Sequence, residues 1–153
     1  MKAIDHIALV VEDMDEAIGL YEETLQAQFY LRETNEEQGF EVAAFAVGDA
    51  HIELLSPTRP DSVIGGFLRK RGPGIHHVAL EVEGIAERVR QLRVQGLQFT
   101  SDAIQCGTGG SQIAFIHPKS LLGTMIELVE PPGDEKARHS AGPAEASAAG
   151  GPA

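Results

Sequence analysis

Apolar residues are spaced in two different ways along the first part of the chain. Residues 4–11 form a β-rich run and predict a strand, whereas the apolar positions after Asp13 recur at helical spacing and predict a helix. Three more strands are predicted at 29–33, 40–47 and 51–56. A proline-flanked link with a short apolar segment at 63–68 follows.

The same order of elements recurs after residue 74. Residues 75–82 predict a strand and 85–94 a helix, and three strands are predicted at 97–99, 112–117 and 124–129. His6 aligns with His77 at an offset of 71 residues, and Glu53 aligns with Glu127 at an offset of 74. Nearly equal offsets at both ends of the unit indicate an internal duplication. We therefore expect an α+β fold in which two tandem βαβββ modules form a concave mixed sheet.

The module boundaries follow from this repeat. The modules are predicted at 1–57 and 74–130, joined by a linker at 58–73, so that 1–130 forms one domain. Of the 23 residues at 131–153, 17 are Gly, Pro, Ala or Ser, and none is aromatic or Ile, Leu or Val. Such a segment buries too little apolar area to offset its conformational entropy, and it is predicted to be a disordered tail.

Charge and cysteine content narrow the classes of function. The 153-residue chain has a formal net charge of −11, which argues against nucleic acid or an anionic membrane as a partner. Its single cysteine, Cys106, excludes an intrachain disulfide and a thiolate zinc cluster. No stretch predicts a signal peptide or a membrane-spanning helix, and the cytoplasm is the expected location.

Four chemically active side chains are predicted on one face of the sheet. Strand residues alternate faces with period two, so His6 and Glu53 in the first module, and His77 and Glu127 in the second, oppose the apolar sets that helices would cover. Two carboxylates brought together repel each other unless a cation lies between them. Imidazole and carboxylate are ligands of divalent first-row metals. The pattern therefore predicts a metal site.

Short motifs add a family resemblance. The strand openings Asp-His-Ile-Ala at 5–8 and His-His-Val-Ala at 76–79, with two Ile-Glu-Leu strands, resemble the vicinal oxygen chelate (glyoxalase/bleomycin resistance/dioxygenase) superfamily. Within it, Asn-Glu-Glu-Gln-Gly at 35–39 and Ile-Ala-Phe-Ile-His-Pro-Lys at 113–119 are most similar to the methylmalonyl-CoA epimerases. The match covers about residues 1–130.

The resemblance implies a glyoxalase-like fold, a homodimer, a small acyl-CoA substrate and a divalent metal ion. The ion would be held by His6, Glu53, His77 and Glu127, with cobalt expected first and nickel, manganese, zinc or iron also acceptable. The implied reaction removes a proton alpha to the thioester and returns it to the opposite face, which interconverts (R)- and (S)-methylmalonyl-CoA. The resemblance nominates Glu37 as one base and Glu127, near or on the metal, as the other.

Three alternatives share this fold. A metal-dependent glyoxalase (lactoylglutathione lyase) uses the same four ligands and fits Glu53, a position where epimerases often have Gln. An extradiol dioxygenase needs two histidines and one carboxylate, so the fourth ligand counts against it. A non-catalytic ligand-binding protein generally lacks the complete ligand set. Candidates for contact with CoA phosphates are the basic run 69–71, Lys119 and the glycine-rich loop 107–110, whereas His51, His76 and His117 are interpreted as structural or supporting residues.

Overall fold

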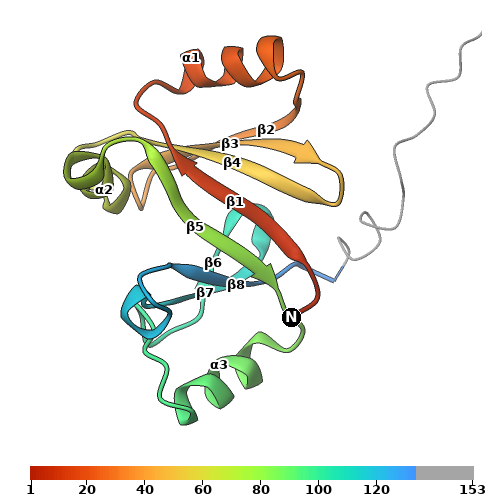
Figure 1. Ribbon diagram of the computed structural model, residues 1–153, viewed down its shortest axis with the longest axis vertical. Helices are drawn as coiled ribbons and strands as arrows, with labels where there is room; N and C mark the ends of the chain where they lie inside the picture. The colour runs from red at the N-terminus through yellow and green to blue at the C-terminus, as the bar shows by residue number, and fades with distance from the viewer. Residues whose placement is uncertain (134–153) are drawn as a thin grey trace, which may run out of the picture.

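The computed structural model describes residues 1–133, which form one eight-stranded mixed sheet flanked by helices (Figure 1). The strands are β1 (Ile4–Val10), β2 (Gln28–Asn35), β3 (Phe40–Val47), β4 (Ala50–Pro57), β5 (Gly74–Glu81), β6 (Gln105–Cys106), β7 (Gln112–Ile116) and β8 (Ile126–Glu130). The helices are α1 (Met14–Gly19), continued by a π-helical turn (Leu20–Thr24), α2 (Val63–Arg71) and α3 (Ile85–Val94), with short 3₁₀ turns at Thr108–Gly110 and Pro118–Ser120.

The strand order is symmetric about the centre of the sheet. It runs β2-β3-β4-β1-β5-β8-β7-β6, so each module contributes four neighbouring strands. β1 pairs in parallel with β4, β5 pairs in parallel with β8, and the antiparallel pair β1–β5 joins the modules. Figure 1 shows these two strands crossing the middle of the molecule side by side. The predicted α+β class and tandem modules are confirmed.

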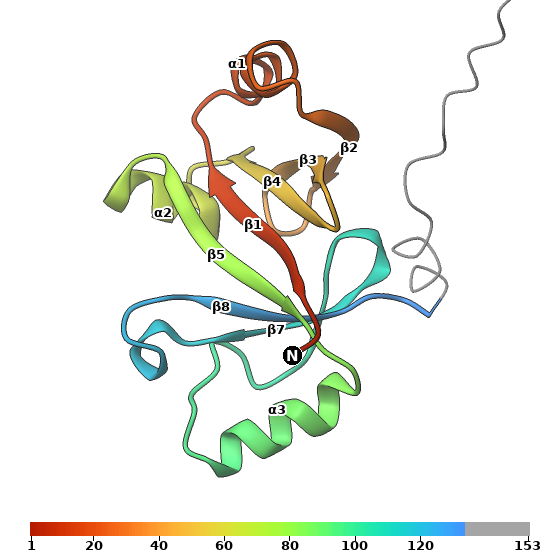
Figure 2. The same cartoon turned by 45° about the vertical axis from the view of Figure 1, so that its right-hand side comes forward.

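Helix α1 covers one face of the first module, as its apolar spacing predicts. The Asp13 side chain caps the helix by accepting a hydrogen bond from the Glu16 backbone N–H at 2.9 Å. Met14 packs with the buried residues Ala43, Phe45 and Leu54. Figure 2 shows α1 and α3 at opposite ends of the molecule, each against its own module.

Helix α3 covers the corresponding face of the second module. Gly84 precedes it at φ 64°, a left-handed conformation that favours glycine. The Glu130 carboxylate accepts hydrogen bonds from the backbone N–H groups of Gly84 at 2.7 Å and Ile85 at 3.0 Å, so the last residue of β8 caps the helix. The buried cluster under α3 consists of Val82, Ile85, Val89, Ala114, Ile116 and Leu128.

Helix α2 lies inside the predicted linker 58–73 and packs on the other face of the first module. The Ser62 hydroxyl accepts a hydrogen bond from the Gly65 N–H at 3.0 Å and caps it. Ile64 packs with the buried Ala8, Val10 and Leu55. The sequence predicts that α1 covers one face of the first module and leaves the face with His6 and Glu53 open. Helix α2 covers part of that second face, because Val10 and Leu55 make this part apolar.

The second module differs from the prediction in two places. The strand predicted at 97–99 is wrong: Phe99 forms only an isolated bridge with Ile116, and the chain bends at Thr100. It returns at β6, which the sequence did not predict and which pairs with β7. Segment 100–104 lies between the two places where the chain pairs with β7. Phe99 pairs at one end of β7 and β6 at the other, so no continuous strand forms.

The described residues end shortly after β8. Most of the predicted tail 131–153 lies outside them, since they stop at residue 133, and the domain boundaries remain a prediction. Within residues 1–133, no helix combines the length and apolar character that crossing a membrane requires.

Candidate metal centre

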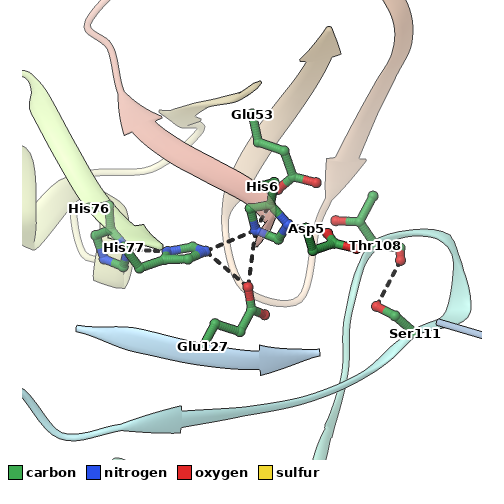
Figure 3. A network of polar contacts seen from close by, with 8 residues as sticks. All are labelled: Asp5, His6, Glu53, His76, His77, Thr108, Ser111 and Glu127. Atoms are coloured by element: carbon green, nitrogen blue, oxygen red, sulfur yellow. Dashed lines mark hydrogen bonds and ion pairs between the residues drawn. The ribbon is translucent and has the colours of Figure 1, made fainter. Parts of the chain in front are cut away.

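Three of the predicted side chains meet at one point (Figure 3). His6 on β1, His77 on β5 and Glu127 on β8 form a nearly equilateral triangle of ligand atoms. His6 Nε2 lies 3.1 Å from His77 Nε2, and Glu127 Oε2 lies 3.0 Å from each of these nitrogens. We call these three residues the triad.

The joint between the modules positions the two histidines. In the antiparallel register of β1 and β5, His6 lies opposite Ala79 and His77 lies opposite Ala8. Both alanines are 0% exposed. Because an alanine has only a methyl side chain, each leaves room beside it for the imidazole on the neighbouring strand, and the two rings meet edge to face with centroids 5.2 Å apart.

The triad is buried, which makes its charges strongly interdependent. His6, His77 and Glu127 are 6%, 5% and 3% exposed. Burial raises the pKa of Glu127, but contacts with His6 and His77 outweigh it and lower that pKa to about 2. Burial lowers the pKa of His6, but the hydrogen bond with Asp5, the contact with Glu127 and the charge of Glu53 raise it to about 10. Without a metal, His6 is therefore an imidazolium and Glu127 a carboxylate at neutral pH.

The geometry of the triad fits a divalent metal. Glu127 Oε2 is buried and has no partner in hydrogen-bonding geometry among residues 1–133. Two nitrogens and one carboxylate oxygen instead point at a common centre, as ligands do. Ligand atoms about 2.1 Å from one cation and at right angles to each other stand about 3.0 Å apart, which matches the observed edges.

Glu53 lies beside the triad rather than in it. Its Oε2 is 3.5 Å from His6 Nε2, but it does not belong to the group of ligand atoms that all lie within 4.8 Å of one another. Glu53 is paired with Ala8 in the register of β4 and β1, as Glu127 is paired with Ala79 in that of β8 and β5. The modules are thus equivalent in backbone position but not in side-chain placement.

Glu37 stands apart from the triad. It is exposed in the turn between β2 and β3, and its backbone carbonyl accepts a hydrogen bond from Arg59 Nη2 at 2.8 Å. Arg59 Nη1 also donates to the carbonyl of Glu36 at 3.1 Å. Arg59 therefore ties this turn to the segment that leads into α2. The turn begins at Asn35, whose side chain accepts from the Gln38 N–H at 2.9 Å.

The residues suggested for CoA phosphates lie on exposed parts of the chain. Arg69, Lys70 and Arg71 occupy the last turn of α2, and Lys119 lies in a 3₁₀ turn after β7. In the glycine-rich loop, Gly109 at φ 66° and Gly110 at φ 80° take the left-handed conformation that tight turns require.

Two further residues contact the triad, and sequence reasoning gave neither of them a defined role in it. Asp5 Oδ1 lies 2.7 Å from His6 Nδ1, and His76 Nδ1 lies 2.8 Å from His77 Nδ1. Strict period-two alternation places each on the face opposite its neighbour. The available signal was positional: both are polar, and both directly precede a histidine of the triad at equivalent points of the repeat.

Comparisons with known proteins agree with this fold. The chain is 37% identical over 139 residues to the uncharacterized protein YqjC of Bacillus subtilis, covering 91% of this chain and 99% of that one. It is 35% identical over 126 residues to the mitochondrial methylmalonyl-CoA epimerase of Mus musculus, covering 82% and 71%. The structure of Streptomyces coelicolor methylmalonyl-CoA epimerase in complex with 2-nitronate-propionyl-CoA superposes with a TM-score of 0.84 at 33% identity, covering 87% and 99%.

The family model for the glyoxalase/bleomycin resistance protein/dioxygenase superfamily matches residues 5–115. This range includes β1 and β5, the strands that join the modules and carry both histidines of the triad. With its tandem modules and its similarity to the epimerases, the chain therefore belongs to the glyoxalase/bleomycin resistance protein/dioxygenase superfamily.

Proposed function

We propose that this protein is a methylmalonyl-CoA epimerase, a metal-assisted isomerase that interconverts (R)- and (S)-methylmalonyl-CoA. The observation that carries the proposal is the convergence of His6, His77 and Glu127 on one buried centre, in a chain similar to epimerases over most of its length. The S. coelicolor relative is in complex with an acyl-CoA compound, which supports a substrate of this class.

The triad would hold the metal, with Glu53 as a neighbouring oxygen ligand. A bound divalent ion supplies Lewis acidity, which stabilises the negative charge that develops on the thioester oxygen when the alpha proton leaves. Cobalt is the ion we expect first, and nickel, manganese, zinc or iron suit the same donors. The burial of the triad excludes water, which strengthens each electrostatic interaction with the substrate.

Inversion needs a proton acceptor on each side of the carbon. We assign one side to a carboxylate oxygen of Glu37 and the other to Glu127, whose Oε2 faces the histidines. In each direction the group that begins as a carboxylate takes the proton from its own side of the alpha carbon, and the group that begins as a carboxylic acid gives its proton to the opposite side. The hydrogen bonds from Arg59 to the turn support Glu37 in this role, because they fix the backbone that carries it.

Exposed cations are proposed to bind the CoA portion. Arg69, Lys70, Arg71 and Lys119 are the candidates, with the 107–110 loop forming one edge of the pocket. The basic run forms the last turn of α2, and Ile64 of this helix packs against Ala8 and Val10 of β1. A homodimer and a cytoplasmic location complete the proposal.

A lactoylglutathione lyase is the second candidate, because Glu53 supplies a carboxylate 3.5 Å from His6 Nε2. One experiment separates the two. Protein loaded with cobalt, and in parallel with nickel, manganese or zinc, is incubated with methylmalonyl-CoA in deuterated water. Mass spectrometry should find deuterium at the carbon alpha to the thioester, and chelated protein should incorporate none. Absence of label with every metal, together with turnover of the methylglyoxal–glutathione hemithioacetal, would establish the lyase instead.

A further inference from the structure

Two β-bulges lie in the β1–β5 pair, one on each strand. The partner of Ile4 is Leu80 and the partner of His6 is Ala79, so Asp5 is the additional residue on β1. A second irregularity occurs one step along β1 from Ala8 to Leu9, where β5 advances by two residues. Its partners change there from His77 to Ile75, so His76 is the additional residue on β5.

A bulge changes which way a side chain points. In a regular strand, consecutive side chains lie on opposite faces, and Asp5 would lie far from the His6 ring. An additional residue interrupts this alternation and re-aims the side chain. Figure 3 shows the result: Asp5 reaches the side of the His6 ring that faces away from the triad's centre, and His76 does the same at His77.

The two contacts lie at the Nδ1 atom of each ring, on the side away from the centre. A carboxylate only accepts hydrogen bonds, so the 2.7 Å contact with Asp5 Oδ1 requires a proton on His6 Nδ1. His76 Nδ1 can accept in the same way from His77 Nδ1 at 2.8 Å. The His76 ring is itself held against Phe67 of α2, with centroids 5.0 Å apart. In both cases Nε2 is left for the centre.

We propose that Asp5 and His76 are positioning residues, which the paired bulges place so that each orients one histidine of the triad with Nδ1–H turned outward and Nε2 turned inward. The inference deepens the proposed function and rests on it for its purpose, although the orientation itself is measurable without a metal. Asp5 and His76 occupy equivalent positions in the two modules but differ chemically. A carboxylate contacts one histidine of the triad, and an imidazole contacts the other.

The first test is metal affinity with Co²⁺ alone as the probe. Asp5→Ala and His76→Phe remove the acceptor, and each should weaken Co²⁺ binding by about 10- to 100-fold. Asp5→Asn and His76→Asp keep an acceptor oxygen and should recover most of the affinity. The visible absorption spectrum of bound Co²⁺ should shift in the first pair and return toward wild type in the second. If Asp5 and His76 served only the stability of the fold, the acceptor-free variants would not lose Co²⁺ affinity and the variants that keep an acceptor would not regain it.

The second test reads the orientation directly. In protein labelled with ¹⁵N-histidine, His6 and His77 should each show an exchange-protected Nδ1–H proton, in the metal-free form and with Zn²⁺. Asp5→Ala should remove the His6 signal alone, and His76→Phe the His77 signal alone. If Asp5→Ala does not fold, Asp5→Asn reports the same proton through its altered chemical shift.

The outcomes separate the two proposals. Wild-type protein that binds no metal but shows both protected protons, each lost in its own variant, would refute the metal-dependent function and support the positioning. Unchanged affinity, spectrum and protons in both acceptor-free variants would overturn the positioning and leave the proposed function standing.

Discussion

The Nε2 atoms of His6 and His77 lie 3.1 Å apart, although 71 residues separate the two histidines in the chain. Two nitrogen lone pairs at this distance repel each other unless a proton or a cation lies between them. The contact is made by the β1–β5 pair, the only strand pair among residues 1–133 that links the two modules. The metal centre therefore forms only where the two modules pair, because each module supplies one of its two histidines.

Removal of a triad ligand should abolish tight metal binding. We expect His77→Ala and Glu127→Ala, loaded with cobalt and then dialysed, to retain well under the approximately one ion per chain of the wild type, because each variant loses one of the three donors of the triad. Elemental analysis measures the content. His117→Gln, which alters a histidine outside the triad, is the control. A full complement of cobalt in Glu127→Ala would contradict the site.

Glu37→Gln should abolish turnover and leave metal content near wild type, because the amide accepts no proton from carbon and the residue lies apart from the triad. The rate at which (R)- and (S)-methylmalonyl-CoA are interconverted measures turnover. The matched control is Glu36→Gln, since Glu36 is the exposed neighbour whose carbonyl Arg59 also binds. Full activity in Glu37→Gln would remove that residue from the mechanism.

Glu53→Gln should keep its metal, because Glu53 lies outside the triad and an amide oxygen takes the same place. Burial raises the pKa of Glu53, as does the charge of Glu127, against the opposing effect of His6. Ionised Glu53 therefore destabilises the metal-free fold above its folded-state pKa. Calorimetry at pH 8 should find a higher unfolding midpoint for metal-free Glu53→Gln than for the exposed control Glu33→Gln. A lower midpoint would show that the charge is stabilising.

Metal binding should release protons at neutral pH. The pKa of His6 in the metal-free protein is about 10, so this histidine is protonated at pH 7 and must lose that proton before Nε2 can bind a cation. We expect release of about one proton per ion, and affinity that rises roughly tenfold per pH unit between pH 7 and 9. Titration calorimetry in buffers of different ionisation enthalpy counts the protons. Heats independent of the buffer would refute this protonation state.

Glu130→Ala should destabilise the fold without weakening metal binding. The carboxylate caps α3 through two backbone N–H groups, and loss of a helix cap costs about 1–2 kcal/mol. Urea unfolding of the metal-free protein measures the loss. The control is Glu83→Ala: its ion pair with Lys2 is exposed, and such pairs contribute little. Equal stability of the two variants would exclude a capping role.

The duplicated pattern of apolar and polar positions was sufficient to predict the class of fold, the tandem modules and the face that carries His6, His77 and Glu127. This succeeded because period-two alternation and helical spacing are local properties, set by which side of an element is buried. The strand expected at 97–99 failed for the converse reason. Whether a short segment pairs along its whole length depends on how the intervening chain returns to the partner strand, and spacing does not record that return.

The sequence by itself determined that two histidines and two glutamates occupy matching places in two similar modules. Only the tertiary structure decided that Glu127 completes the triad while Glu53 lies beside it, because the two glutamates hold equivalent backbone positions and differ in where their side chains lie. The joint between β1 and β5 contains the bulges that turn Asp5 and His76 toward the histidines. Alternation along one strand is written in neighbouring residues, whereas the register between strands 71 residues apart is set by packing across the whole sheet.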